Sequence, residues 1–334
     1  MSEYVFKSVF APYIHNFLTV KDTMGFGLKK FKGVFKEFDL FFIAETVEAP
    51  CITRSLIAKW KATRVNDSNR TLYDKYSIIS QFSKYMSHIG YPCYAPCLPR
   101  RNFGNYVPCV FTHDQISDIF HACDSFVMAC GNMDCKLFAI PAILRLLYST
   151  GMRVGEAVGL RNGDMDLEHN RIIIRKTKNR RHRLIPLHPS MYQVLYQYRN
   201  ARNRFPLQDM NTPDAFFFIS PSGQPLNRGN IYTWFKKALK KCGIPHLGKH
   251  HGPRVHDLRH TCAVHALMQQ VKNGSDIYCI LPVLSIFLGH KTITGTEHYV
   301  KLTLEMYPDI IKSEQSISSF VFPSLPPIKT DYEK

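Results

Sequence analysis

The stretch LGHKTITGTEHYVKL, residues 288–302, places His290 nine positions before Tyr299 in a strongly basic chain. Glycine and threonine surround both residues. Tyr299 is one of 17 tyrosines, and packing in a core is the ordinary role of any single tyrosine. A second role is nucleophilic, because a tyrosine hydroxyl can attack a phosphate when nearby groups stabilise the developing charge. The rest of the sequence has to decide between the two roles.

The composition describes a basic globular chain whose partner carries negative charge. With 334 residues, the chain is long enough for two domains or for one large domain with a buried core. Lysine and arginine number 43 and aspartate and glutamate 26, so the formal net charge is +17 and the pI is near 9.4. This surplus favours nucleic acid or an acidic membrane surface as the partner.

Membrane insertion, export and a metal or other cofactor are not expected. No apolar run approaches the ~20 residues of a membrane-spanning helix. The N-terminal sequence MSEYVFKSVF lacks the charged-then-apolar order of a signal peptide. The ten cysteines show no disulfide-like framework, so reduced thiols in the cytoplasm are expected. Cys93, Cys97 and Cys109 with His113 approach a metal-ligand spacing, but they lack the paired CxxC units of a zinc module.

The first hundred residues show the periodicity of amphipathic helices. Two apolar stripes recur at helical spacing: Phe31, Phe35, Phe38 and Phe42, then Leu72, Tyr76, Ile79, Phe82, Met86 and Ile89. Gly90, ahead of Pro92, is expected to end the second helix. Residues 1–25 form either an extra arm or the first helix of a bundle, and their spacing favours the helix. The lysines around the first stripe form either a solvated face or a basic side that lies along a duplex: Lys29, Lys30, Lys32 and Lys36.

A linker separates this helical part from a second domain. Residues 91–110, YPCYAPCLPRRNFGNYVPCV, contain four prolines, one glycine and two adjacent arginines without an apolar period. We therefore expect a helical N-terminal domain over residues 1–106, with the linker 91–106 included, and a second domain over residues 107–334. The spacing of Thr112 and Gln115 predicts a capping box near the start of the second domain.

The second domain mixes helices with a small antiparallel sheet. A helix is expected over Pro141–Tyr148, followed by a turn at Thr150 and Gly151. Two β-prone runs, Arg171–Arg175 and Arg183–Leu187, flank a basic turn and predict a hairpin. The segment AFFFISPSGQPL predicts a short strand and a turn, and NIYTWFKKALKKCGI predicts an amphipathic helix that Gly243 ends. The expected fold is mainly α with a small antiparallel β-sheet.

Several segments carry residues suited to breaking a phosphodiester without a metal or nucleotide. Such a reaction needs guanidinium groups for the charged oxygens, a nucleophile, and a proton donor for the departing oxygen. The candidates, in chain order, are Arg153 in TGMRVGEAVGL, Lys178 in the basic hairpin, His256 and Arg259 in HDLRHT, His290 in LGH, and Tyr299.

Each candidate, taken singly, also has a structural interpretation. Arg153 and Glu156 have the spacing of a surface ion pair on a helix, and Lys178 is one of many basic residues. His256 and His260, at i and i+4, suggest either packing or a metal, although no glutamate follows the first histidine as in a zincin.

The ordered set of motifs is more specific than any member. TGMRVGEAVGL, then KTKNRRHRLIPL, then HDLRHT, then LGH with a tyrosine nine residues later resembles the catalytic domain of tyrosine recombinases, the phage-integrase family. The resemblance covers roughly residues 107–305, with AFFFISPSGQPLN and WFKKALKKCGI also similar. It implies a helical core-binding, SAM-like DNA-binding domain followed by an α+β catalytic domain, which together close as a clamp on DNA. The stretch SDIYCILPVLSIF is a few residues longer than is common in the family.

The resemblance also implies a role for each motif residue. Arg153 and Arg259 would clamp the scissile phosphate, and Tyr299 would attack it to form a 3′-phosphotyrosyl link. Lys178 would protonate the departing 5′-oxygen, with Lys176 as the fallback. His256 would assist proton transfer and His290 would bind the phosphate. Glu156 would support the helix that bears Arg153.

The implied function is site-specific DNA recombination without metal or ATP, in the integration, excision or transposition of a mobile element. The implied partners are double-stranded recombination sites and three further copies of the chain, as a tetramer on two sites and a monomer or weak dimer off DNA. The 35 residues after Tyr299 suit the family's exchange of a C-terminal helix between neighbours. Accessory DNA-bending or co-recombinase proteins stay open, and the expected location is cytoplasmic and nucleoid-associated.

Three alternatives stay open at this point. A type IB topoisomerase uses nearly the same residues to nick and reseal DNA, but the separate N-terminal domain and C-terminal tail favour recombination. A non-catalytic DNA-binding accessory protein on this fold is disfavoured by the intact set of motif residues. A zinc protein would use His256, His260 and the cysteine cluster.

Overall fold

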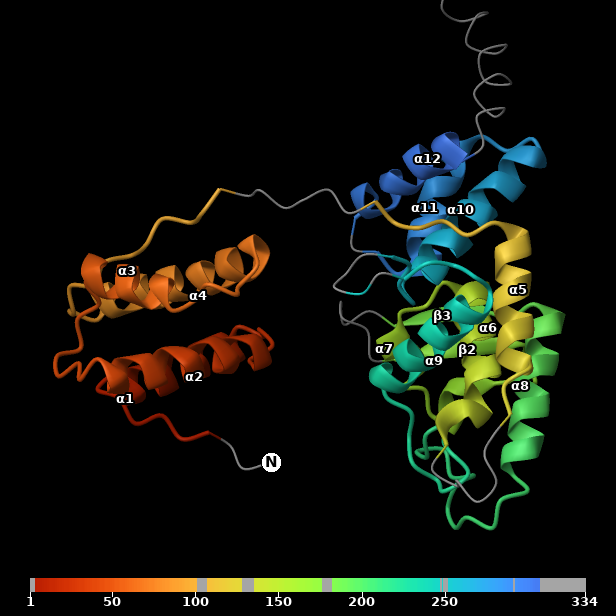
Figure 1. The fold of residues 1–334 in the computed structure, drawn as a ribbon, viewed down its shortest axis with the longest axis horizontal. Helices are drawn as coiled ribbons and strands as arrows, with labels where there is room; N and C mark the ends of the chain where they lie inside the picture. The colour runs from red at the N-terminus through yellow and green to blue at the C-terminus, as the bar shows by residue number, and fades with distance from the viewer. Residues whose placement is uncertain are drawn as a thin grey trace, which may run out of the picture. The chain divides into compact units, whose positions relative to one another are not determined.

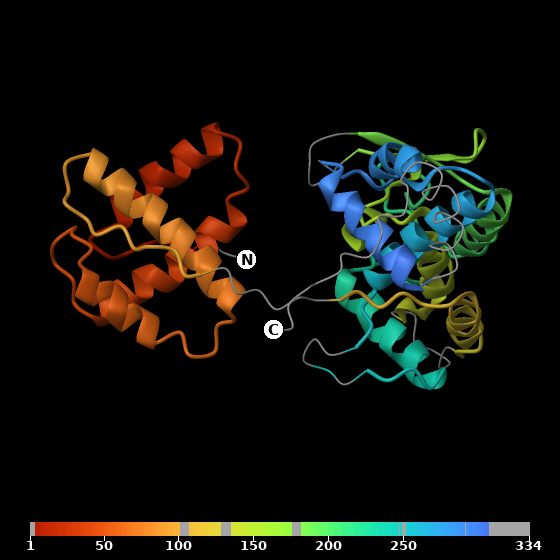
Figure 2. The ribbon, with the colours of Figure 1, turned by 90° about the horizontal axis from the view of Figure 1, so that it is seen from above.

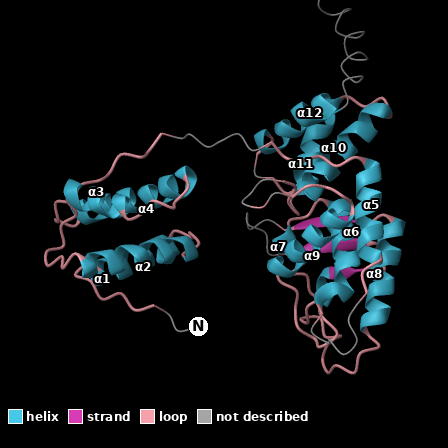
Figure 3. Ribbon diagram, in the orientation of Figure 1, coloured by secondary structure: helices cyan, strands magenta, loops and turns pink. Residues whose placement is uncertain are grey.

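The structure is a computed structural model that describes residues 4–100, 107–127, 135–175, 182–246, 248, 252–290 and 292–306. The chain divides into two compact units, residues 1–106 and 107–334. The units consist mostly of helices, with one small antiparallel sheet in the second unit (Figures 1 and 3). This confirms the predicted fold class.

The N-terminal unit is a bundle of four helices. They are α1 (Ala11–Thr23), α2 (Lys29–Ala44), α3 (Arg54–Ala62) and α4 (Asn69–His88). Helix α4 packs against both α1 and α2 (Figure 2). Helix α1 confirms the preference for a helix within residues 1–25. The segment before it is anchored by the buried Asp39, which accepts hydrogen bonds from the Tyr4 hydroxyl at 2.8 Å and the Ser8 amide at 2.9 Å.

An aromatic core holds this bundle together. The whole first predicted stripe, from Phe31 to Phe42, is buried. Phe35 meets Phe82 edge-on at 5.0 Å, and Phe38 meets Trp60 edge-on at 5.4 Å, in the geometry that aromatic pairs prefer. The second stripe is buried from Tyr76 to Met86, but Ile89 is 42% exposed because α4 ends one residue before it.

The second unit holds eight α-helices and two short 3₁₀ helices within its described residues. They are α5 (His113–Asp124), η1 (Lys136–Ala139), α6 (Ile140–Thr150), α7 (Val154–Ala157), η2 (Asn162–Asp164), α8 (Pro189–Arg202), α9 (Arg228–Lys241), α10 (Asp257–Lys272), α11 (Ile277–Leu288) and α12 (Thr294–Met306). The predicted capping box is present at the start of α5, where the Thr112 side chain accepts from the Gln115 amide. Helix α9 buries its apolar face, exposes its lysines and is followed by Gly243 with a φ of +69°, as predicted.

The sheet has three antiparallel strands in the order β1 (Met165–Asp166), β2 (Arg171–Ile174) and β3 (Arg183–Pro186). Ile172 lies opposite Ile185 in the register of β2 and β3, and both are fully buried. The predicted hairpin is therefore confirmed, whereas β1 was not predicted. The strand expected in AFFFISPSGQPL is wrong: these residues form only isolated bridges, Arg161 to Phe216 and Ile219 to Pro225.

Helix α11 contains the sequence that is longer than usual for the family. It runs as one helix with Pro282 inside it, and the Asp276 side chain caps its first turn. Although α11 is very apolar, it has only 12 residues. None of the helices in the described residues is long and apolar enough to cross a membrane.

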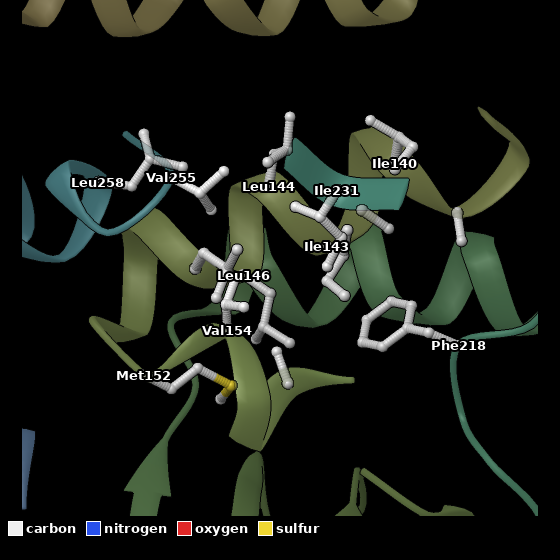
Figure 4. Close-up of a cluster of buried hydrophobic side chains, with 14 of the residues drawn as sticks. Ile140, Ile143, Leu144, Leu146, Met152, Val154, Phe218, Ile231, Val255 and Leu258 are labelled. Carbon is white, nitrogen blue, oxygen red and sulfur yellow. The ribbon is translucent and has the colours of Figure 1, made fainter. Parts of the chain in front are cut away.

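Helix α6 lies at the centre of the core of the second unit. Its Ile140, Ile143, Leu144 and Leu146 point into a cluster with Ile231 of α9 and Phe218 (Figure 4). Val255 and Leu258, at the start of α10, join the same cluster, as do Met152 and Val154 (Figure 4). This packing fixes the turn between α6 and α7 and the start of α10, which carry two of the candidate motifs.

Gly151 makes the turn between α6 and α7 possible. Its φ of +57° lies in the left-handed region that side chains disfavour. A Cβ at this position would lie 2.8 Å from Cδ2 of Leu288 and 3.3 Å from Sγ of Cys262. The turn therefore approaches α10 and α11 too closely for any side chain.

We predict that Gly151→Ala lowers the free energy of unfolding by about 2 kcal/mol, because it adds both backbone strain and a steric contact. Urea denaturation of the purified chain measures this. Gly33→Ala is the matched control: Gly33 lies within α2 and has no atom within 4 Å of a built Cβ, so stability should rise by about 0.5–1 kcal/mol. Equal effects of the two changes would contradict the argument.

Candidate active site

Arg259 is the buried centre of the candidate site. It lies in the first turn of α10, is 2% exposed, and donates from Nη1 to the Gly151 carbonyl at 2.7 Å. Its Nη2 donates to the Leu288 carbonyl at 2.8 Å. Burial, followed by the charge of Arg153, lowers its pKa to about 10, while Tyr299 opposes the shift. The guanidinium therefore stays positive at neutral pH.

Arg153 is the N-cap residue of α7 and lies near the same place. Its Nη1 donates to Oε1 of Glu156 at 2.9 Å, and its Nη2 donates to the Gly289 carbonyl at 3.2 Å. The Arg153 amide also donates to Oε2 of Glu156 at 2.9 Å. The pair of Arg153 and Glu156 exists, but it is not a surface ion pair, because Glu156 is buried.

Arg183 is the second cationic partner of Glu156. Its Nη2 donates to Oε2 of Glu156 at 2.7 Å and its Nη1 to Oε1 at 3.2 Å. Burial alone would raise the pKa of Glu156, but the hydrogen bonds from Arg183 and Arg153 keep it below its ordinary value. Glu156 is therefore a buried carboxylate held between two arginines.

His290 and Tyr299 meet beside the arginines. Their rings stack with centroids 6.1 Å apart and planes 12° apart, and Nδ1 of His290 lies 2.8 Å from the Thr296 hydroxyl. Tyr299 lies in α12 and is 2% exposed. Burial raises its pKa, whereas the charge of Arg259 and a hydrogen bond with it act in the opposite direction.

His256 and His260 lie on the same side of the site. His256 is the N-cap residue of α10, and its ring meets that of His260 edge-on at 4.9 Å. The His260 ring lies 5.5 Å from that of Tyr299. His256 is exposed at the surface, yet packing around its ring and then the charges of Arg259 and Arg153 lower its pKa to about 4. His256 is therefore neutral at pH 7.

Segments that lie far apart in the sequence thus converge. Arg153 contacts the residue before His290, His290 stacks on Tyr299, and Tyr299 interacts with Arg259. His256 is close enough to both arginines for their charges to lower its pKa. The arrangement offers two guanidinium groups, a tyrosine hydroxyl and neutral imidazoles in one place, which suits attack on a phosphodiester.

The phage integrase family model matches residues 110–306 of this chain, which is more than half of it. The chain belongs to the phage integrase family. The putative integrase/recombinase y4rB of Sinorhizobium fredii (strain NBRC 101917 / NGR234) is 26% identical over 315 residues, covering 91% of this chain and 96% of that protein. Tyrosine recombinase XerC of Chlamydia caviae is 28% identical over 248 residues, which cover 72% of this chain and 70% of that protein.

Solved structures show the same fold for this phage integrase family member. XerH site-specific recombinase bound to difH substrate has a TM-score of 0.63 at 17% identity, covering 84% of this chain and 79% of that one. The Tn1549 transposon integrase in complex with a circular intermediate DNA has a TM-score of 0.61 at 18% identity, and the match covers 86% of this chain and 94% of that one.

Family membership confirms the predicted family and enzyme class. The chain is a tyrosine recombinase, and its function is site-specific DNA recombination. The alternatives of a type IB topoisomerase and a non-catalytic accessory protein are not favoured by these relatives. In the part of the recombinase that the structure describes, no group of three or more histidine, cysteine or acidic side chains is placed to hold a metal.

The candidate general acid of the recombinase is not among the residues just described. Lys178 and its fallback Lys176 lie outside the described residues. The flanking strands β2 and β3 are described, and Ile174 lies opposite Arg183 at the end of their pairing. The choice between the two lysines stays a prediction.

Sequence reasoning missed Arg183 as a residue of the recombinase site. Arg183 was expected only as the first residue of the second β-prone run of the hairpin. A signal was available, because side chains two positions apart share one face of a strand, and Arg183 stands two residues before the apolar Ile185. An arginine on the core-facing side of a strand requires an acidic partner, which here is Glu156.

We predict that acid destabilises the recombinase fold through its histidines. Burial lowers the pKa of His260 to about 3 and that of His290 to about 4, below the ordinary value of 6.5. Their stabilising contribution is therefore complete above pH 6.5 and is lost as the pH falls toward 4. Chemical denaturation at pH 7.5, 6 and 5 should show this loss, and His260→Gln should reduce it. An equal loss in wild type and His260→Gln would contradict the assignment.

Proposed function

We propose that the recombinase cleaves and rejoins DNA through a covalent bond between Tyr299 and a 3′-phosphate, with the motif residues in the roles given below. The observation that supports this most is the convergence of Arg153, Arg259, His290 and Tyr299. Their contacts join α7, α10, α12 and the turn after α11 at one site. The ordinary packing role of a buried tyrosine would not require a hydrogen bond with Arg259 or the nearby charge of Arg153.

In the proposed reaction the Tyr299 hydroxyl oxygen attacks the phosphorus and the bond to the 5′-oxygen breaks. Arg153 and Arg259 stabilise the charge on the non-bridging oxygens, for which planar guanidinium groups are suited. Both arginines are held by carbonyls at helix ends, so their orientation is set before DNA arrives. His290 adds a hydrogen bond to the phosphate.

Two protons have to move in this step. The Tyr299 hydroxyl loses one, and His256 assists its transfer: its ring is neutral at pH 7, and the negative charge of a bound phosphate would raise its lowered pKa toward the range of a general base. The departing 5′-oxygen gains the other from Lys178. The products are a 3′-phosphotyrosyl bond and a free 5′-hydroxyl, and attack by a second 5′-hydroxyl reverses the step. Because the phosphodiester energy is kept in the covalent link, strand exchange needs no ATP.

Access to Tyr299 requires a local rearrangement. Tyr299 is 2% exposed in this structure, so a DNA phosphate cannot reach its hydroxyl without movement of neighbouring side chains or of α12. Tyr299 is also held protonated, since burial raises its pKa. The proposed reaction therefore begins when a bound phosphate and the arginines around it replace the packing that covers the hydroxyl.

The N-terminal unit is proposed as the core-binding domain of a DNA clamp. The support is its four-helix bundle, its position before the linker and the net charge of +17 for the whole chain. Lys29, Lys30 and Lys36 on α2 are exposed and suit contacts with phosphates, which make binding sensitive to salt.

The proposed assembly is a tetramer on two recombination sites. Among the similar structures, a lambda integrase tetramer is bound to a Holliday junction. The names of the relatives y4rB and the Tn1549 transposon integrase support a role in integrating, excising or transposing a mobile element. Such a role places the recombinase in the cytoplasm with the nucleoid. The nine cysteines that the structure describes are unpaired, which is consistent with that compartment.

A trap of the covalent intermediate tests the function. Nicked suicide DNA substrates from the flanks of the protein's own gene are incubated with the protein, which is then denatured and separated by size. Wild type should give a slower protein–DNA band and Tyr299→Phe none, although both bind the DNA. A band that survives in Tyr299→Phe would move the nucleophile to another residue. Absence of a band in wild type across all flanking sites would reject the proposed reaction.

We predict that a 5′-bridging phosphorothiolate substrate restores cleavage to Lys178→Ala. The 5′-sulfur leaves without a proton, so loss of the general acid no longer slows the step. Lys176→Ala is the matched control and should cleave ordinary DNA at close to the wild-type rate. Rescue of Lys176→Ala in place of Lys178→Ala would assign the acid to Lys176.

A further inference from the structure

Arg183 lies in the sheet of the second unit with its side chain turned away from solvent. It is the first residue of β3, and its side chain is 7% exposed. A guanidinium has five N–H donors and cannot lose its charge in a protein, so burial is costly unless acceptors and a counter-charge surround it. The partners of Arg183 therefore show what it does.

The guanidinium joins two of the segments that form the candidate site. Nη1 and Nη2 form a forked pair with the two oxygens of Glu156, at 3.2 and 2.7 Å. Nε donates to the Phe287 carbonyl at 3.1 Å, at the end of α11. Arg183 thus links β3 with α7 and with the turn that leads to His290.

Glu156 is shared between Arg183 and Arg153. The two carboxylate oxygens of Glu156 that bind Arg183 also accept hydrogen bonds from Arg153. Oε1 accepts one from Nη1 of Arg153, and Oε2 accepts one from its backbone amide. Without Arg183, Arg153 would be the sole counter-ion of a buried carboxylate and would be drawn toward it. With Arg183 present, the carboxylate is neutralised and Arg153 keeps a positive charge available to a phosphate.

Arg183 also supports the turn that carries His290. Gly289 has a φ of +70°, and a Cβ there would lie 2.8 Å from Nη1 of Arg183. The turn therefore packs directly on the guanidinium, with room for glycine alone. The Gly289 carbonyl in turn accepts from Nη2 of Arg153. Movement of Arg183 would therefore disturb both the Gly289 turn and the Arg153 side chain that binds its carbonyl.

We propose that Arg183 is a positioning residue for DNA cleavage: it neutralises Glu156 and holds the Gly289–His290 turn, so that Arg153 and His290 face the scissile phosphate. This inference rests on the function proposed above. Arg183 itself does not touch the reacting atoms. It sets the charge and orientation of the residues that do.

A double-mutant cycle tests the charge argument. Arg183→Met should slow single-turnover cleavage of a suicide substrate about 100-fold, the loss that a small misplacement of reacting groups causes. Glu156→Gln should slow it about 10-fold and the double variant about 30-fold, far less than the product of the two losses, because no unbalanced carboxylate is left to draw Arg153 away while the Gly289–His290 turn still lacks its support. Losses that multiply to about 1,000-fold would mean that Arg183 does not act through Glu156, and would overturn the proposal.

The controls separate this proposal from its alternatives. DNA affinity, measured by gel shift, should stay within about twofold in all variants. Arg171→Met is the matched control, since Arg171 lies in the same sheet and pairs with Asp166 at 2.6 Å outside the site; it should cleave like wild type. If Arg183→Met does not fold, Arg183→Lys carries the test, with a cleavage rate about 10-fold below wild type expected.

The outcomes also distinguish the two proposals. Wild type without a Tyr299-dependent covalent band would reject the proposed reaction itself. A normal band in wild type together with unchanged cleavage by Arg183→Met, or by Arg183→Lys in its place, would reject the role of Arg183 alone.

Discussion

The site depends on one buried guanidinium that joins the ends of two helices. Arg259 donates to the carbonyl of Gly151, the residue that follows α6, and to that of Leu288, the last residue of α11. Carbonyls at a helix C-terminus lack partners within the helix and carry partial negative charge, so a buried arginine is well satisfied there. The same two ends lead directly to Arg153 and His290. One side chain thereby sets the distance between two motifs that are far apart in the chain, and the hydrogen bond from Arg153 to Gly289, 136 residues away, joins the same motifs.

Positive charge gathers around Arg259, and one buried carboxylate balances part of it. Arg153 and Arg183 share the buried Glu156, while packing around their rings and the charge of Arg259 keep His256, His260 and His290 neutral. A phosphate would supply the negative charge that this cluster lacks. The electrostatic arrangement thus favours an anionic transition state, and the two arginines themselves need little reorganisation because backbone carbonyls already hold them.

Glycines at both helix ends make this arrangement possible. Gly151 and Gly289 both take positive φ values, and a Cβ at either would lie 2.8 Å from a neighbouring side chain. Close backbone approach lets Arg259 and Arg183 reach their carbonyl partners. In the N-terminal unit the corresponding organising feature is the aromatic core around Phe35, Phe38 and Phe82, which needs no polar contacts.

The sequence by itself predicted several of the helices, the hairpin, the family and a set of candidate motif residues. Apolar periodicity predicted α2, α4 and α9, because the buried face of each helix consists of apolar residues three or four positions apart within that helix. The tertiary structure alone decided that Arg183 and Arg153 share Glu156, and that residues 215–226 form bridges instead of a strand. These features arise from contacts between segments distant in the chain: local spacing indicated the pair of Arg153 and Glu156, but it does not show that Arg183, 27 residues away from Glu156, joins them.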